Sequence, residues 1–120
     1  MNPELGLQLW SVRESLQKDY AGTLEKVADI GYKNLELITT VTPEGLIFGD
    51  GMRAAELRTN LDRFGLRAVS CHFVPIPNMN LQAILDDLNV LGVDSLACAI
   101  AFFNNREEVV NFNAAFNRYA

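Results

Sequence analysis

The chain has 120 residues, of which 49% are hydrophobic and 21% charged, and its formal net charge at pH 7 is -5. This composition predicts one globular domain covering residues 1–120 and excludes a disordered chain. The acidic balance argues against a nucleic-acid-binding protein, because phosphate contacts need clustered Lys and Arg. No secretory signal and no apolar run of the roughly 20 residues that a membrane span needs is present, so we expect a cytoplasmic protein without a membrane partner.

The first expected strand covers residues 5–12, where leucines alternate with small or polar residues and one aromatic. The two sets are Leu5, Leu7, Leu9 and Gly6, Gln8, Trp10. A charged loop over residues 13–19 follows, and then a helix that begins near Ala21 and stops at Gly31.

The second expected strand is Asn34 to Ile38, with Glu36 on the face where the first strand has Gln8. A long connection, Thr39 to Gly51, contains one proline and three glycines and is expected to be a loop. A helix from about Met52 to Gly65 comes next.

The third expected strand, Leu66 to Pro75, carries the single histidine of the sequence, His72. With period two, one face is small or polar and the other is apolar. The two faces are Ala68, Ser70, His72 and Val69, Cys71, Phe73.

A helix from about Asn80 to Gly92 leads to a fourth strand, Ser95 to Ala101, which again has one apolar and one small face. These faces are Leu96, Cys98, Ile100 and Ala97, Ala99, Ala101. The two cysteines, Cys71 and Cys98, lack the spacing of a metal or redox pair, so we expect buried free thiols. A last helix is expected after an N-cap at Asn104 or Asn105, and its buried face would be Val109, Phe112 and Phe116.

Strands alternating with helices indicate an α/β fold with parallel strands. A doubly wound sheet needs strands that are apolar on both faces, whereas these are apolar on one face. We therefore predict four βα units that form a (β/α)4 half of a TIM (β/α)8 barrel, with helices on the outer face and the small or polar residues lining the inside.

Gln8, Glu36 and His72 would lie near the C-terminal ends of three strands on the inner face, where barrels of this kind bind substrates. An amide, a carboxylate and an imidazole suit the hydroxyl groups of a sugar or polyol, and Trp10 could supply a flat wall for a sugar ring. Each of these side chains also has a purely structural explanation. Gln8 could satisfy backbone groups through hydrogen bonds, and Trp10 could serve packing alone. Arg13 is expected to be solvated or locally paired, with a phosphate contact as the minor alternative.

The segments 5–14 (Leu-Gly-Leu-Gln-Leu-Trp-Ser-Val-Arg-Glu), 23–37 and 56–72 resemble the opening of the xylose isomerase-like TIM barrel family, in particular its sugar phosphate isomerase/epimerase branch. The resemblance implies the N-terminal half of a metal-dependent sugar or sugar-phosphate isomerase or epimerase, inactive alone. It assigns substrate-binding roles to Gln8, Trp10, Glu36 and His72.

The resemblance also implies a divalent ion, Mn, Mg, Zn or Co, in the full-length family. Its ligands come mainly from the later strands of that barrel, so no metal is expected on this chain alone and no catalytic residue is assigned. Two alternatives stay open: a polyol dehydratase on the same scaffold, and a non-catalytic half-barrel that self-associates. The expected partners are a small sugar or polyol and either a second copy or the missing C-terminal half.

Overall fold

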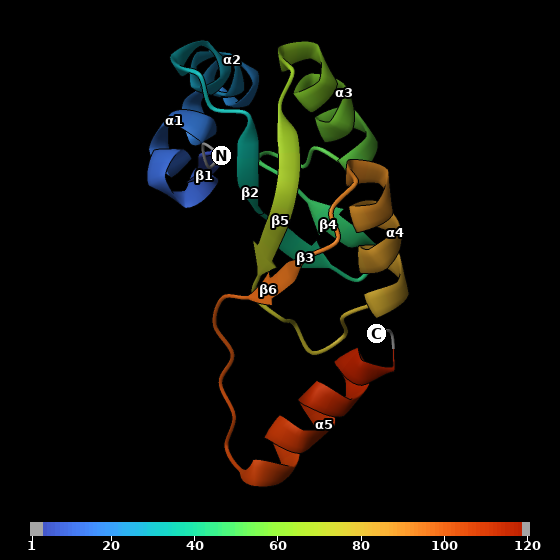
Figure 1. Cartoon of the computed structure of the whole chain (residues 1–120). Coiled ribbons are helices and arrows are strands. Elements are labelled where there is room, and N and C mark those ends of the chain that lie inside the picture. Colours follow the sequence, from blue (N-terminus) through green and yellow to red (C-terminus); the bar gives the residue numbers. More distant parts are fainter. Residues whose placement is uncertain (1–3, 119–120) are drawn as a thin grey trace.

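Four parallel strands form the central sheet of the computed structural model, which describes residues 4–118 (Figure 1). They are β1 (Gly6–Gln8), β2 (Asn34–Ile38), β5 (Arg67–Phe73) and β6 (Leu96–Cys98), and they lie side by side in this order. Because each strand pairs with the next along the chain, right-handed connections place the intervening helices on one side of the sheet. A doubly wound sheet instead reverses its strand order near the centre. The prediction of a half-barrel arrangement is therefore confirmed.

Three helices return the chain between these strands, namely α2 (Tyr20–Ile30), α3 (Ala54–Phe64) and α4 (Leu81–Leu91). Each ends at a glycine with positive φ, where an L side chain would be strained. As predicted, these residues are Gly31, Gly65 and Gly92, with φ of 114°, 64° and 71°. Within residues 4–118, no helix combines the length and apolarity needed to cross a lipid bilayer.

The outward side of the sheet and the helices share one hydrophobic core. Leu35 and Leu37 of β2 and Cys71 and Phe73 of β5 are at most 1% exposed. They join buried helix residues that include Leu24, Leu57, Leu61 and Leu88. Burying each such leucine contributes about 2 kcal/mol, so the helices are held to this face of the sheet and the opposite face stays open.

A bulge in β5 corrects the expected alternation of the third strand. Leu35 of β2 pairs with Ala68, whereas the next residue, Glu36, pairs with Ser70. Val69 has no partner in β2, so the alternation of side chains between the two faces of β5 shifts by one residue at this point. Ala68 is consequently buried in the outer core and Val69 is 37% exposed, which is the reverse of the prediction for both.

The first strand is shorter than predicted, and the charged segment after it is helical. A 3-10 turn, η1 (Leu9–Val12), continues into α1 (Arg13–Lys18). Leu16 of α1 is 5% exposed, and burial of this one apolar side chain in the core holds the segment as a helix rather than a loop. Leu5 lies outside the strand and is exposed, contrary to the expected apolar face.

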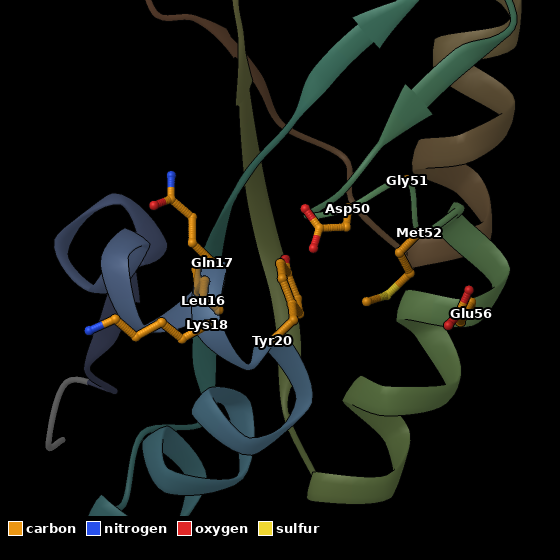
Figure 2. A pocket seen from close by; sticks show the side chains of 8 residues that line it. All are labelled: Leu16, Gln17, Lys18, Tyr20, Asp50, Gly51, Met52 and Glu56. Atoms are coloured by element: carbon orange, nitrogen blue, oxygen red, sulfur yellow. The ribbon is translucent and has the colours of Figure 1, made fainter.

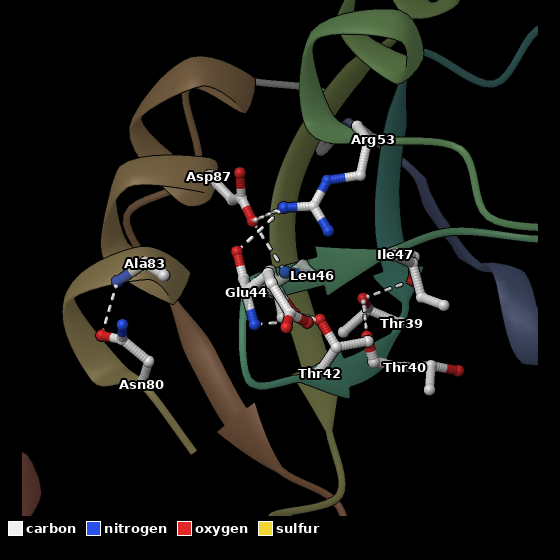
Figure 3. Close-up of polar contacts among 11 residues, drawn as sticks. Thr39, Thr40, Thr42, Glu44, Leu46, Ile47, Arg53, Asn80, Ala83 and Asp87 are labelled. Atoms are coloured by element: carbon white, nitrogen blue, oxygen red, sulfur yellow. Dashed lines mark hydrogen bonds and ion pairs between the residues drawn. The ribbon is translucent and has the colours of Figure 1, made fainter. Parts of the chain in front are cut away.

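The connection expected to be a loop contains a β-hairpin, β3 (Thr40–Thr42) and β4 (Gly45–Ile47). Its apolar residues Val41, Leu46 and Phe48 are buried. Asp87 of α4 accepts a hydrogen bond of 2.7 Å from the Leu46 N–H (Figure 3). The hairpin is therefore a packed part of the fold.

The fourth barrel strand is also shorter than predicted. Only Leu96 to Cys98 pair with β5, and the chain then leaves the sheet. Cys71 is buried as expected, but Cys98 is exposed because it lies at the open edge. Ile100, expected on the outer side, follows the end of the strand and lines the inner cavity instead.

Helix α5 (Arg106–Asn117) lies beyond the end of the strands, apart from the sheet (Figure 1). Asn105 is its N-cap and accepts a hydrogen bond from the Glu108 N–H. The expected buried face is confirmed only in part: Phe112 and Phe116 are partly buried, whereas Val109 is 37% exposed, and no residue of this helix is fully buried. The helix touches the core through Phe116, whose ring lies 5.8 Å from that of Phe73.

Candidate functional site

Polar side chains from three neighbouring strands meet on the open face of the sheet. Gln8 Nε2 donates a hydrogen bond of 2.6 Å to Glu36 Oε1, and Ser70 Oγ donates one of 2.7 Å to Glu36 Oε2. His72 Nδ1 lies 3.3 Å from Glu36 Oε1. Parallel pairing of β1, β2 and β5 brings these residues together from positions up to 64 apart in the sequence, from Gln8 to His72. We call this set, Gln8, Glu36, Ser70 and His72, the polar cluster.

Glu36 is the centre of the polar cluster and is held as a carboxylate. The Ser70 hydroxyl and then the Gln8 amide lower the pKa of Glu36, with a smaller contribution from His72, and they outweigh the opposing effect of partial burial. Donors that favour the charged form act in this direction. A carboxylate engaged in this way orients its neighbours and is a weak proton acceptor.

His72 is the group of the polar cluster best placed to handle a proton. Its side chain is 16% exposed, and Glu36 faces its Nδ1 atom. Of the two neutral tautomers of the ring, a carboxylate at Nδ1 favours the one that carries its proton on that nitrogen. Nε2 is then left as an acceptor for a hydroxyl group in the cavity.

Gln8, Glu36 and His72 of the polar cluster form the floor of an open cavity of about 900 Å³, and Ser70 supports Glu36 from outside the lining. One wall comes from the segment after β1, with Trp10, Arg13 and Tyr20. The hairpin and the segment after it form another wall, and the alanines of the fourth strand region line the third. The residues of these two walls include Thr39, Thr40, Ile47, Asp50, Ala97 and Ala99. This volume is within the range of small-molecule sites.

Trp10 borders the cavity without joining the polar cluster. The indole is 54% exposed, and the guanidinium carbon of Arg13 lies 4.7 Å from the centre of its ring. The four residues predicted to bind substrate therefore line one cavity, and three of them are bonded or in close contact through Glu36. Their role in substrate binding stays a prediction.

Tyr20 lines both this cavity and a smaller one of about 290 Å³. Its ring lies between the α1–α2 side and the segment that carries Asp50, Gly51 and Met52 (Figure 2). Within residues 4–118 its hydroxyl has no hydrogen-bond partner, and burial raises the pKa of Tyr20, with Cys71 as the smaller cause. Tyr20 therefore contributes a neutral side chain to the walls of both cavities.

A divalent ion does not fit the donors of the described chain. Residues 4–118 contain no group of three or more His, Cys, Asp or Glu side chains placed to hold a metal. Glu36 and His72 are neighbours, but both oxygens of the carboxylate already face donors of the polar cluster. We therefore derive no step through a metal, and the absence of a metal on this chain alone stays a prediction.

Two solved structures share this arrangement of strands and helices. A sugar phosphate isomerase/epimerase from Parabacteroides distasonis matches 98% of this chain with a TM-score of 0.76 at 22% sequence identity. The chain has the fold of half such a barrel. A second sugar phosphate isomerase/epimerase from the same organism matches 98% of the chain with a TM-score of 0.69 at 24% identity.

The chain spans about half the length of these structures, covering 46% of the first and 49% of the second. Neither a family model nor a curated protein sequence matches it. At this identity the likeness establishes the half-barrel fold, so the predicted resemblance to the isomerase/epimerase barrel is confirmed at the level of fold.

Sequence reasoning placed Ser70 on the inner face but did not select it as a site residue. The spacing of Ser70 from His72 could have identified it, because residues two apart on a strand share a face. Asp50 and Thr40 were missed as cavity residues. Their positions depend on how the hairpin packs, which alternation within one strand does not indicate.

Proposed function

We propose that this chain supplies half of the substrate pocket of a sugar or sugar-phosphate isomerase or epimerase. The observation that carries this proposal is the polar cluster itself, since Glu36 gathers an amide, a hydroxyl and an imidazole at an open cavity of about 900 Å³. The half-barrel fold shared with two proteins of that name supports it.

The polar cluster suits a polyhydroxylated ligand. Gln8 donates to Glu36 through Nε2, which leaves its Oε1 atom to accept a hydrogen bond from a substrate hydroxyl. His72 Nε2 can take the proton of a hydroxyl group while Glu36 holds the ring through Nδ1. Isomerisation and epimerisation move protons between adjacent carbon and oxygen atoms, and an imidazole positioned by a carboxylate suits the hydroxyl part of that task.

Binding of sugars to the 120-residue chain tests this role directly. Calorimetric titration with aldoses, ketoses and their phosphates is expected to give binding that weakens about 10-fold or more in Glu36→Gln, because the donors of the polar cluster lose their charged partner. Glu25→Gln, an exposed change on α2, is the matched control and should leave the affinity unchanged. Equal affinities in the two variants would contradict the assignment. Cyclic polyols in the same titration test the dehydratase alternative.

We further propose that the isolated chain pairs with a second copy. Within residues 4–118, β1 pairs only with β2 and β6 only with β5, so both edges of the sheet are open. Several apolar side chains stay exposed near the β6 edge, among them Ile100 at 53% and Phe102 at 90%. Two copies would bring eight strands together, the number that closes a barrel of this type.

A further inference from the structure

Arg13 is the one Lys or Arg among the described residues that line the large cavity. Two carboxylates, Glu36 and Asp50, line it as well. Glu36 is already engaged by the polar cluster. Arg13 makes no ion pair within 4.0 Å with any carboxylate of residues 4–118, and that includes Asp50.

The guanidinium group of Arg13 is held in place without being neutralised. Its central carbon lies 4.7 Å from the centre of the Trp10 ring, and Nη1 donates a hydrogen bond of 2.9 Å to the Trp10 carbonyl oxygen. Stacking on an indole and one backbone hydrogen bond restrict the long side chain before any ligand arrives. Nε and Nη2 have no hydrogen-bond partner among residues 4–118 and are free to donate.

A planar cation with free donors is the typical partner of a phosphate or carboxylate group, which it can bind through two parallel hydrogen bonds. The polar cluster on the floor of the same cavity offers partners for neutral hydroxyl groups. The two features complement each other, because a ligand that satisfies both must carry hydroxyl groups and an anionic group.

We infer that Arg13, stacked on Trp10, is a specificity-determining residue that binds the anionic group of a polyhydroxylated substrate. The substrate class is therefore a sugar phosphate or a sugar acid rather than a neutral sugar. This inference rests on the proposed function, since the hydroxyl groups of the same ligand would occupy the polar cluster.

Trp10 is the single tryptophan of the chain, so its fluorescence reports on this site alone. Titrations of the full chain with glucose, glucose 6-phosphate and gluconate compare a neutral sugar with its phosphate and carboxylate counterparts. We expect the phosphate ester, the carboxylate or both to bind about 10- to 100-fold more tightly than glucose and to change the Trp10 emission, as charge-assisted hydrogen bonds do. The ligand that binds more tightly than glucose, whether glucose 6-phosphate or gluconate, identifies the anionic group that Arg13 binds.

Arg13→Gln should remove the preference for the anionic ligand over glucose. Arg13→Lys keeps the charge without the planar donors and should retain part of the preference. Arg63→Gln is the matched control: Arg63 stacks on Phe64 at 5.3 Å and lies outside the cavity lining, so this variant removes a charge and a cation–π pair elsewhere. It should keep the full preference.

Equal binding of glucose, glucose 6-phosphate and gluconate by the unmodified chain would overturn the assignment of Arg13. If Glu36→Gln still weakened glucose binding in that case, the proposed function would stand without it. A parallel loss of glucose and glucose 6-phosphate affinity in Arg13→Gln would also overturn the assignment, because Arg13 would then merely support the cavity wall. If none of the three ligands bound, both the function and the inference would fall.

Discussion

Glu36 accepts hydrogen bonds from two donors and faces a third group in a partly exposed position. Its side chain is 30% exposed, so water competes with these partners without replacing them. Gln8 and Ser70 each lose a charged acceptor if this carboxylate is removed. Glu36 is therefore expected to contribute both to the proposed binding site and to the stability of the fold.

Glu36→Gln should lower the free energy of unfolding at pH 7 by about 1–3 kcal/mol, since hydrogen bonds to a charged acceptor are replaced by weaker neutral ones. The pKa of Glu36 is lowered in the folded protein from its ordinary value of 4.5. Its stabilising effect is thus fully present above about pH 5 and is lost as the pH falls through the folded-state pKa. Urea unfolding between pH 7 and pH 3 should give a shallower decline in the variant than in the unmodified chain.

Glu25→Gln is the control for this experiment, because Glu25 is exposed on α2. The pKa of Glu108 is also lowered, first by the Asn104 backbone N–H, and this carboxylate loses its partners in the same acidic range. Glu108 is present in every variant, so its contribution cancels in the difference between curves. Parallel pH profiles for the unmodified chain and Glu36→Gln would contradict the prediction.

Which residues face the cavity was predictable where strand alternation decides it. Gln8, Glu36 and His72 share a face because the period of a strand is two residues. Trp10 reached the cavity for another reason, since β1 ends at Gln8 and a 3-10 turn carries the indole. Arg13 follows the same turn, and a 3-10 turn of four residues is too short to give a periodic signal.

Among the elements, the β3–β4 hairpin shows how one cavity wall is held in place by a helix that does not itself line the cavity. Asp87 of α4 accepts a hydrogen bond from the Leu46 N–H at 2.7 Å, and Arg53 lies 4.0 Å from the same carboxylate oxygen. Arg53 also donates to the Glu44 carbonyl oxygen at the hairpin turn (Figure 3). The hairpin brings Thr40 and Ile47 to the cavity, so its anchor supports the site.

Asp87→Ala should loosen this hairpin and cost about 1–3 kcal/mol, because the N–H of the buried residue Leu46 loses its charged acceptor. Hydrogen exchange followed by NMR is expected to show faster exchange for the amides of β3 and β4, with little change in β2. Asp86→Ala, one residue away, is the control, since Asp86 is exposed and bonds to Gln82 within its own helix. Uniform acceleration across all strands would show that Asp87 supports the whole fold instead.

Helix ends were the most predictable elements and short strands the least. Gly31, Gly65 and Gly92 end their helices as expected because a positive φ selects glycine strongly. The hairpin was taken for a loop because its strands have three residues each, too few for alternation to be read. The position of α5 depends on contacts beyond its own sequence, so an apolar stripe alone did not place it.

At the scale of the whole molecule, the sheet formed by residues 4–118 has two open edges and a polar inner face. Cys98 and Ile100 are exposed at the β6 edge, and Leu5 is 71% exposed near the β1 edge. Open parallel edges with apolar neighbours favour association. The net charge of -5 on each copy opposes it, and salt screens that repulsion.

Light scattering of the 120-residue chain should therefore give a mass above 13.4 kDa, close to two copies, with more association as the salt concentration rises. Phe102→Ser should weaken the association, because Phe102 is 90% exposed in the segment that follows the β6 edge strand. Ile30→Ser is the matched control: Ile30 is 75% exposed at the end of α2, away from that edge, and its loss should leave the mass unchanged. A folded monomer of the unmodified chain at every concentration and salt level would end the proposal of closure by a second copy. The sugar-binding tests of Glu36 and Arg13 would be unaffected, because those residues lie within one copy.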